Sequence, residues 1–233
     1  MRRTIRNLCV HSLAFAVISS IGAAFADTTA PESHVVALTN TDWSQNLVFA
    51  KFDPALGTLT RVDFSLEGHV VGSAKFENTG ASASTVTMQL KADITLTRPD
   101  SSLLVTTIPI ANTSDTVSAF DGTSDFGGTS GRTYNNLSAS LTNVSFTMAG
   151  ADLALFTGPG SVTLPISAKG TSNATGSGSI ITQFSTQAGA TATIFYTFTV
   201  VPAVVPEPAS IALTAIGGIG FLALFRKRIA RKG

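Results

Sequence analysis

The stretch that decides the fold runs from Val86 to Leu96 and reads Val-Thr-Met-Gln-Leu-Lys-Ala-Asp-Ile-Thr-Leu. Every second residue is apolar, and the residues between them are Thr, Gln, Lys and Asp. Successive side chains of a β-strand point to opposite faces of the sheet. A period of two therefore predicts a strand with one face in a core and the other in water.

The same alternation recurs on both sides of this stretch. It predicts strands over 62–70, 162–166 and 192–200, and after Gly72 the apolar positions continue at Ala74 and Phe76 with Lys75 and Glu77 outward. Between residues 137 and 148 the apolar positions change phase at Thr142-Asn143. A phase change of one residue inside a strand predicts a β-bulge.

From residue 27 to 203 no segment has a convincing helical period, and Gly, Asn, Asp and Ser interrupt the strands often. Many short strands joined by such turns predict an all-β fold, an antiparallel β-sandwich. A barrel is the alternative, because alternation does not encode which strands pair. The segment 171–179, rich in Thr, Ser and Gly, is expected to be a loop.

Residues 1–26 have the organisation of an export signal. Arg2, Arg3 and Arg6 precede an apolar stretch, and Ala24-Phe25-Ala26 places small residues where signal peptidase reads them. Cleavage is predicted between Ala26 and Asp27. An uncleaved membrane helix is the alternative, but the stretch is short for a span of about 20 residues. The single cysteine, Cys9, precedes the apolar stretch, which disfavours a lipid-attachment site.

Residues 204–233 have the organisation of a membrane anchor. Residues 209–225 carry no charge and would form a transmembrane helix of roughly 26 Å, near the lower limit for a bilayer. Arg226, Lys227 and Arg228 follow at once and predict a cytoplasmic C-terminus. Pro206-Glu207-Pro208 brackets the helix start, which is equally typical of a plain anchor and of a protease recognition site.

The order Val205-Pro206-Glu207-Pro208-Ala209-Ser210, apolar helix and Arg-rich end resembles the PEP-CTERM sorting signal of Gram-negative bacteria. The resemblance implies recognition by an exosortase, a membrane-embedded cysteine protease-transpeptidase, removal of the helix and transfer to the cell surface. Members of that family are associated with exopolysaccharide and biofilm matrix. The resemblance covers about thirty residues and concerns the address of the protein rather than the activity of its body.

Two segments of the body, residues 51–59 and 120–131, are similar to the choice-of-anchor E domain. This similarity implies a β-rich surface module without an assigned chemistry. The segment 120–131 also holds the best metal candidates, Asp121 and Asp125, whose carboxylates together with backbone carbonyls could hold Ca²⁺. The favoured interpretation is a turn in which each Asp binds its own backbone amides.

The charge of the body disfavours one class of function. Outside the leader and tail the chain carries 7 basic and 13 acidic residues, a net charge of −6. Nucleic-acid binding is disfavoured, because phosphate recognition needs a Lys/Arg surface. No cofactor is expected, and zinc is excluded by the lack of Cys and of paired His in the body.

Two further functions remain as alternatives. Trp43 and Tyr134, in loop-like sequence, could stack on a sugar, whereas Tyr196 is expected in the core. A secreted hydrolase would need a Ser-His-Asp arrangement around His34, expected in a mobile region, or His69, expected on an outward face; no local motif supports it. The leading expectation is therefore a non-enzymatic exported surface or matrix protein, handled by the export machinery and an exosortase, with exopolysaccharide as a candidate partner.

Overall fold

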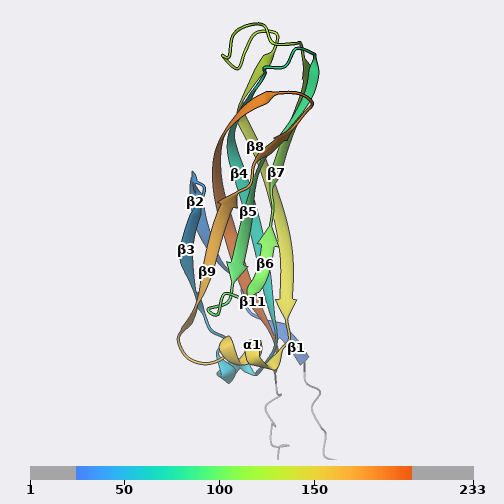
Figure 1. Ribbon diagram of the computed structural model, residues 1–233. Coiled ribbons are helices and arrows are strands. Elements are labelled where there is room, and N and C mark those ends of the chain that lie inside the picture. The colour runs from blue at the N-terminus through green and yellow to red at the C-terminus, as the bar shows by residue number, and fades with distance from the viewer. Residues whose placement is uncertain (1–24, 201–233) are drawn as a thin grey trace, which may run out of the picture. The chain divides into compact units, whose positions relative to one another are not determined.

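The computed structural model describes residues 25–200, which form one compact all-β unit, Phe25–Val200. Two antiparallel sheets pack face to face as a sandwich (Figure 1). The predicted sandwich is thus confirmed and the barrel is not the architecture. No helix within residues 25–200 is long and apolar enough to span a bilayer, and the predicted span at 209–225 lies outside the described residues.

The first sheet has five strands in the order β1-β11-β4-β8, with β2 also paired to β11. Its two longest strands, β4 and β11, pair from Asn78 with Ile180 to Thr58 with Thr199. The bounds are Phe25–Thr28 for β1, Glu32–Asn40 for β2, Thr58–Asn78 for β4, Gly131–Thr147 for β8 and Ile180–Val200 for β11.

The second sheet has six strands in the order β10-β5-β9-β3, with β6 and β7 also paired to β5. The bounds are Trp43–Ala50 for β3, Ser84–Thr97 for β5, Leu103–Thr107 for β6, Ile110–Val117 for β7, Ser161–Gly170 for β9 and Asn173–Thr175 for β10. The 3-10 helix η1, Pro54–Leu56, and the helix α1, Gly150–Leu155, are each too short to leave a helical period in the sequence.

The strand predicted from Val86–Leu96 is the central strand of this second sheet. Its apolar residues are completely buried, whereas the polar residues between them are partly exposed. Six inward side chains face the other sheet and form most of the strand's contribution to the core: Val86, Met88, Leu90, Ala92, Ile94 and Leu96. The period-two prediction is confirmed here and along β4 and β11.

The bulge predicted at Thr142-Asn143 is wrong. There β8 pairs regularly with β4, Glu67 with Thr142 and Leu66 with Asn143, and the register shifts instead opposite Gly72 and Ala74. Because β8 keeps a regular pairing with β4 where the apolar positions change phase, the apolar residues after that point lie on the outer face. Val144 and Phe146 therefore point outward from the sandwich and are exposed. Local alternation could not distinguish a bulge from a strand that exposes apolar residues.

Three smaller expectations also need correction. Glu77, expected outward, is completely buried, because the segment 118–130 folds back and binds its carboxylate. The expected loop 171–179 contains β10, which pairs with β5. His34 lies in β2 rather than in a mobile segment.

Both ends of the described chain lie at one end of the sandwich, since Phe25 pairs with Val200. The loops around residues 79–83, 118–130 and 176–179 lie at the opposite end (Figure 1). A strand of 21 residues such as β4 spans about 70 Å at 3.3 Å per residue. The sandwich is therefore elongated, and the described chain enters and leaves it at the same end.

Candidate functional site

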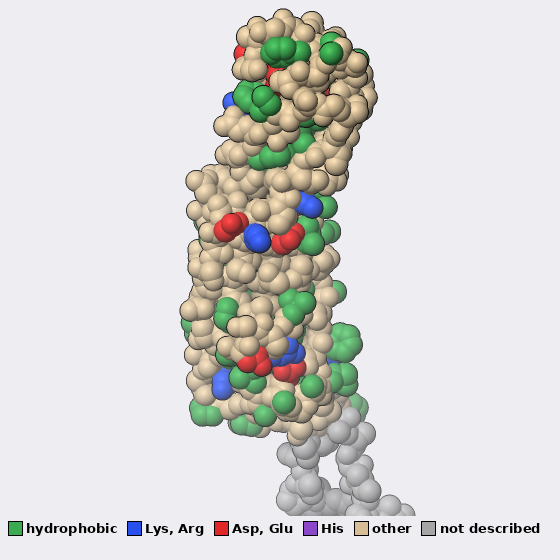
Figure 2. Space-filling view, viewed as in Figure 1, with side chains coloured by type: hydrophobic (Ala, Val, Ile, Leu, Met, Phe, Trp, Pro, Cys, Tyr) green, Lys and Arg blue, Asp and Glu red, His purple; other side chains and the backbone are tan. Residues whose placement is uncertain are grey.

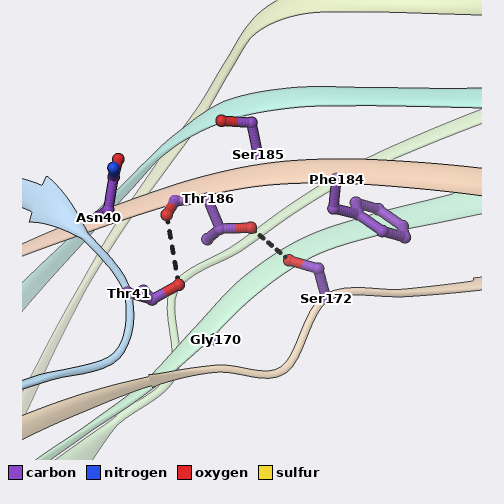
Figure 3. Close-up of a pocket in the computed structure, with 7 residues that line it drawn as sticks. All are labelled: Asn40, Thr41, Gly170, Ser172, Phe184, Ser185 and Thr186. Atoms are coloured by element: carbon purple, nitrogen blue, oxygen red, sulfur yellow. Dashed lines mark hydrogen bonds between the residues drawn. The ribbon is translucent and has the colours of Figure 1, made fainter.

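A polar hollow of the sandwich lies where the β2–β3 turn and the link from β9 to β10 cross β11 (Figure 3). It has a volume of about 400 Å³ and is lined by Asn40, Thr41, Gly170, Ser172, Phe184, Ser185 and Thr186. The lining offers hydroxyl, amide and backbone groups together with one aromatic ring.

Side-chain hydroxyls of this hollow are fixed by a hydrogen-bond network around Thr186. The Thr41 hydroxyl donates to the Thr186 carbonyl over 3.2 Å, and the hydroxyls of Ser172 and Thr186 are 3.0 Å apart. Ser172 also accepts from the backbone N–H of Lys91 over 3.1 Å. No lining residue titrates near neutral pH, so the hollow can bind hydroxylated, uncharged ligands but offers no general acid or base.

The two metal candidates use their carboxylates within their own loop. Asp121 accepts backbone N–H groups from Thr123 and Thr129, both over 3.1 Å, and Asp125 accepts from Gly127 over 2.9 Å. These backbone hydrogen bonds, the one from Thr123 above all, lower the pKa of Asp121. Within residues 25–200 no three His, Cys, Asp or Glu side chains come together as metal ligands would.

Sequence reasoning missed Glu77 as the residue that organises this loop. One carboxylate oxygen accepts the backbone N–H of Phe126 over 2.8 Å, and the other accepts the Ser130 hydroxyl. The only sequence signal was an acidic residue at the end of a strand, which is far more often exposed.

The aromatic residues expected to bind sugar are engaged in the fold. Trp43 begins β3 and donates its indole N–H to the Ala188 carbonyl over 3.0 Å, and the Tyr134 hydroxyl, on β8, donates to Asp115. Both rings pack partly buried against core clusters rather than standing in loops. Tyr196 is buried as predicted, its hydroxyl donates to Ala50, and burial raises the pKa of that hydroxyl.

The structure brings one Ser, His and Glu into a row that the sequence did not predict. The Nδ1 atom of His69 lies 2.9 Å from the Ser140 hydroxyl, and its Nε2 atom lies 3.4 Å from Glu67. The row crosses the outer face of β4, which pairs with β8 on one side and β11 on the other. The row lies exposed on this face, whereas acyl transfer needs preorganised oxyanion donors in a site from which water is excluded. The other histidine, His34, contacts Glu32 over 3.1 Å and packs edge-on against Phe49.

Sorting residues lie mostly outside the described residues: Ala24, Pro206, Glu207, Pro208, Arg226, Lys227 and Arg228. Ala26 and Asp27 lie in β1, where they pair with Thr199 and Phe198 and all four strand residues are exposed. Cleavage between Ala26 and Asp27 would remove the first two residues of β1.

Comparison with known proteins does not assign the chain to a family. No family profile and no curated protein sequence matches it. Among solved structures, the infectious bursal disease virus Gx strain matches 81% of this chain and 48% of its own, with 13% identity and a TM-score of 0.16. The VP2 subviral particle of the same virus matches 83% and 47%, with 11% identity and a TM-score of 0.20. The chain spans about half the length of these viral proteins, and TM-scores this low carry no argument.

Proposed function

We propose that this protein is an exported surface or extracellular-matrix component whose β-sandwich makes structural or adhesive contacts and is not an enzyme. The leader, the C-terminal tail with Pro206-Glu207-Pro208 and the resemblance to PEP-CTERM proteins support the address. The observation that carries the proposal is the pairing of Asp27, the predicted first residue of the mature chain, with Phe198 near the C-terminal end of the sandwich. A domain with both chain ends at one end can be held there, while its opposite end projects by about 70 Å.

Mass spectrometry of intact protein from cells with and without an exosortase tests the address. Surface material is expected to begin at Asp27 and to lack Arg226–Gly233, and a Pro206→Ala/Glu207→Ala/Pro208→Ala variant should keep the tail. A Thr116→Ala variant, changed at an exposed position of β7, should be processed normally. Mature surface protein that still carries Arg226–Gly233 would exclude exosortase processing and leave a plain anchor.

A second function, binding of exopolysaccharide, is favoured by the hollow of Figure 3. Neutral sugars are recognised through hydroxyl and amide groups beside an apolar surface, and Thr186, Ser172, Asn40 and Phe184 supply both. The earlier candidates Trp43 and Tyr134 contribute to packing instead.

Retention of the protein on purified exopolysaccharide tests this second function. An Asn40→Ala/Ser172→Ala variant should lose retention if the hollow binds sugar, whereas Thr116→Ala should bind like the wild type. Equal retention of both variants, with unchanged circular dichroism, rejects the hollow as the sugar site.

A further inference from the structure

A group of exposed apolar side chains surrounds the end of the sandwich at which the described chain begins and ends. On β8 and just after it, Val144 is 77%, Phe146 56% and Met148 61% exposed. Leu56 in η1 and Leu103 at the start of β6 are also about half exposed. We call these five residues the basal apolar group. Figure 2 shows hydrophobic side chains on the surface of the lower end of the sandwich.

The register of the first sheet places this group close to the chain ends. Phe146 pairs with Asp63, and Asp63 pairs with Phe195, only five residues before Val200. Phe195 and Phe146 stand on either side of β4 and line a mostly apolar hollow of about 550 Å³, together with Val144 and Ser65. This hollow beside the basal apolar group could therefore accept apolar groups, and residues 25–200 leave it open.

Two nearby arginines are already paired with carboxylates. The Arg61 guanidinium lies 4.1 Å from the centre of the Phe146 ring and donates to Asp63, and Arg98 donates to Asp152 over 2.6 Å. A surface of this kind does not depend on attraction to anionic headgroups. Binding of this surface would instead be driven by burial of its apolar area.

We propose that the basal apolar group rests in the interfacial region of a lipid bilayer, so that the sandwich is oriented by direct contact with the membrane. This inference rests on the proposed anchoring of the chain by residues 209–225. Eight residues, 201–208, separate Val200 from that segment and reach at most about 29 Å when extended. The basal end is therefore confined to the neighbourhood of the bilayer surface.

Confinement also compensates for the small size of the group. A few exposed apolar side chains bind a membrane weakly when the domain is free. A short tether raises their effective concentration at the surface to the millimolar range. The contact should therefore form in the anchored chain and be released once the tail is cleaved.

Tryptophan fluorescence of the full chain in vesicles tests the contact. The only tryptophan is Trp43, so a Trp43→Phe background can carry one reporter. Phe146→Trp is the basal reporter, Val144→Trp is a second in case the first does not fold, and Ile181→Trp, exposed at the opposite end, is the matched control. Each variant is reconstituted into phosphatidylcholine vesicles with and without brominated acyl chains.

The basal reporters should be quenched roughly twofold by the brominated lipid, since interfacial side chains lie about 5–10 Å into the headgroup boundary. The control at Ile181 should not be quenched, and salt should not change either result. Basal reporters that stay unquenched, or that are shielded only in a dimer found by light scattering, overturn the proposal. Carbonate extraction of the same vesicles reports on the tail separately: retained but unquenched protein rejects the contact alone, whereas extracted protein rejects the anchor and the contact together.

Discussion

At the scale of single residues, Gly72 is a position of β4 that has no room for a side chain. A Cβ atom at this position would overlap the carbonyl oxygen of Ser185 on β11, next to the register shift between β4 and β8. Gly72→Ala should therefore lower the free energy of unfolding by about 1–3 kcal/mol, the usual cost of overpacking. Gly150→Ala is the control, because nothing lies within 4 Å of its Cβ position and Ala favours α1. Urea denaturation of both variants checks the difference, and equal midpoints would contradict it.

The row of Ser140, His69 and Glu67 invites a second residue-scale prediction. A fluorophosphonate probe should not label Ser140, because the row lies exposed on the face of the sheet and an oxyanion is stabilised by preorganised donors in a water-excluded site. Intact-mass analysis after incubation with the probe checks this. Labelling that disappears in Ser140→Ala and in His69→Gln would revive the hydrolase alternative.

At the scale of elements, the helix α1 is held to the β5–β6 turn by one ion pair. Arg98 binds both carboxylate oxygens of Asp152, at 2.6 and 2.7 Å, and Thr147 donates to the same carboxylate. The hydrogen bonds from Arg98 lower the pKa of Asp152. Because the folded pKa is depressed, the contribution of this carboxylate is complete above its ordinary pKa of about 3.9 and is lost as pH falls through the folded value.

Asp152→Asn should accordingly cost about 2 kcal/mol at pH 7, the typical worth of hydrogen bonds to a charged group. The difference from the wild type should shrink as pH falls below about 4, because the carboxylate of the unfolded chain is protonated there and that of the folded chain only at lower pH. Denaturation at a series of pH values measures it, with the exposed Glu67→Gln as control. A difference that is independent of pH would show that the charge of Asp152 does not stabilise α1.

The elements also show how far the sequence could predict this protein. Along β4, β5 and β11, one face is buried and the other is not, so alternation predicted the strands and their inward sides. It failed at Val144 and Phe146, because an apolar residue that remains exposed gives the same pattern as one moved inward by a bulge. It failed at Glu77 and Trp43, whose partners Ser130 and Ala188 are far away in the chain. The hollow around Thr186 could not be predicted, because three distant segments form it.

At the scale of the whole sandwich, the core divides into two clusters along the long axis, and this division predicts how the domain opens. The larger cluster includes Ile94, and a smaller one at the end opposite the chain termini contains only Ala74, Phe76, Val86, Met88 and Val117. Met88 and Ile94 are completely buried on the same face of β5.

Truncation of either side chain to Ala should cost about 2–5 kcal/mol of unfolding free energy if the sandwich is a fully cooperative unit. A cluster of five residues is weakly stabilised, however, so Met88→Ala should raise hydrogen exchange chiefly around residues 74–76, 84–88 and 117, by local opening. Ile94→Ala should instead raise exchange throughout the sandwich and lower the global unfolding midpoint. Uniform loss of protection in both variants would mean that β4 and β11, which run through both clusters, couple the two ends into a single cooperative unit.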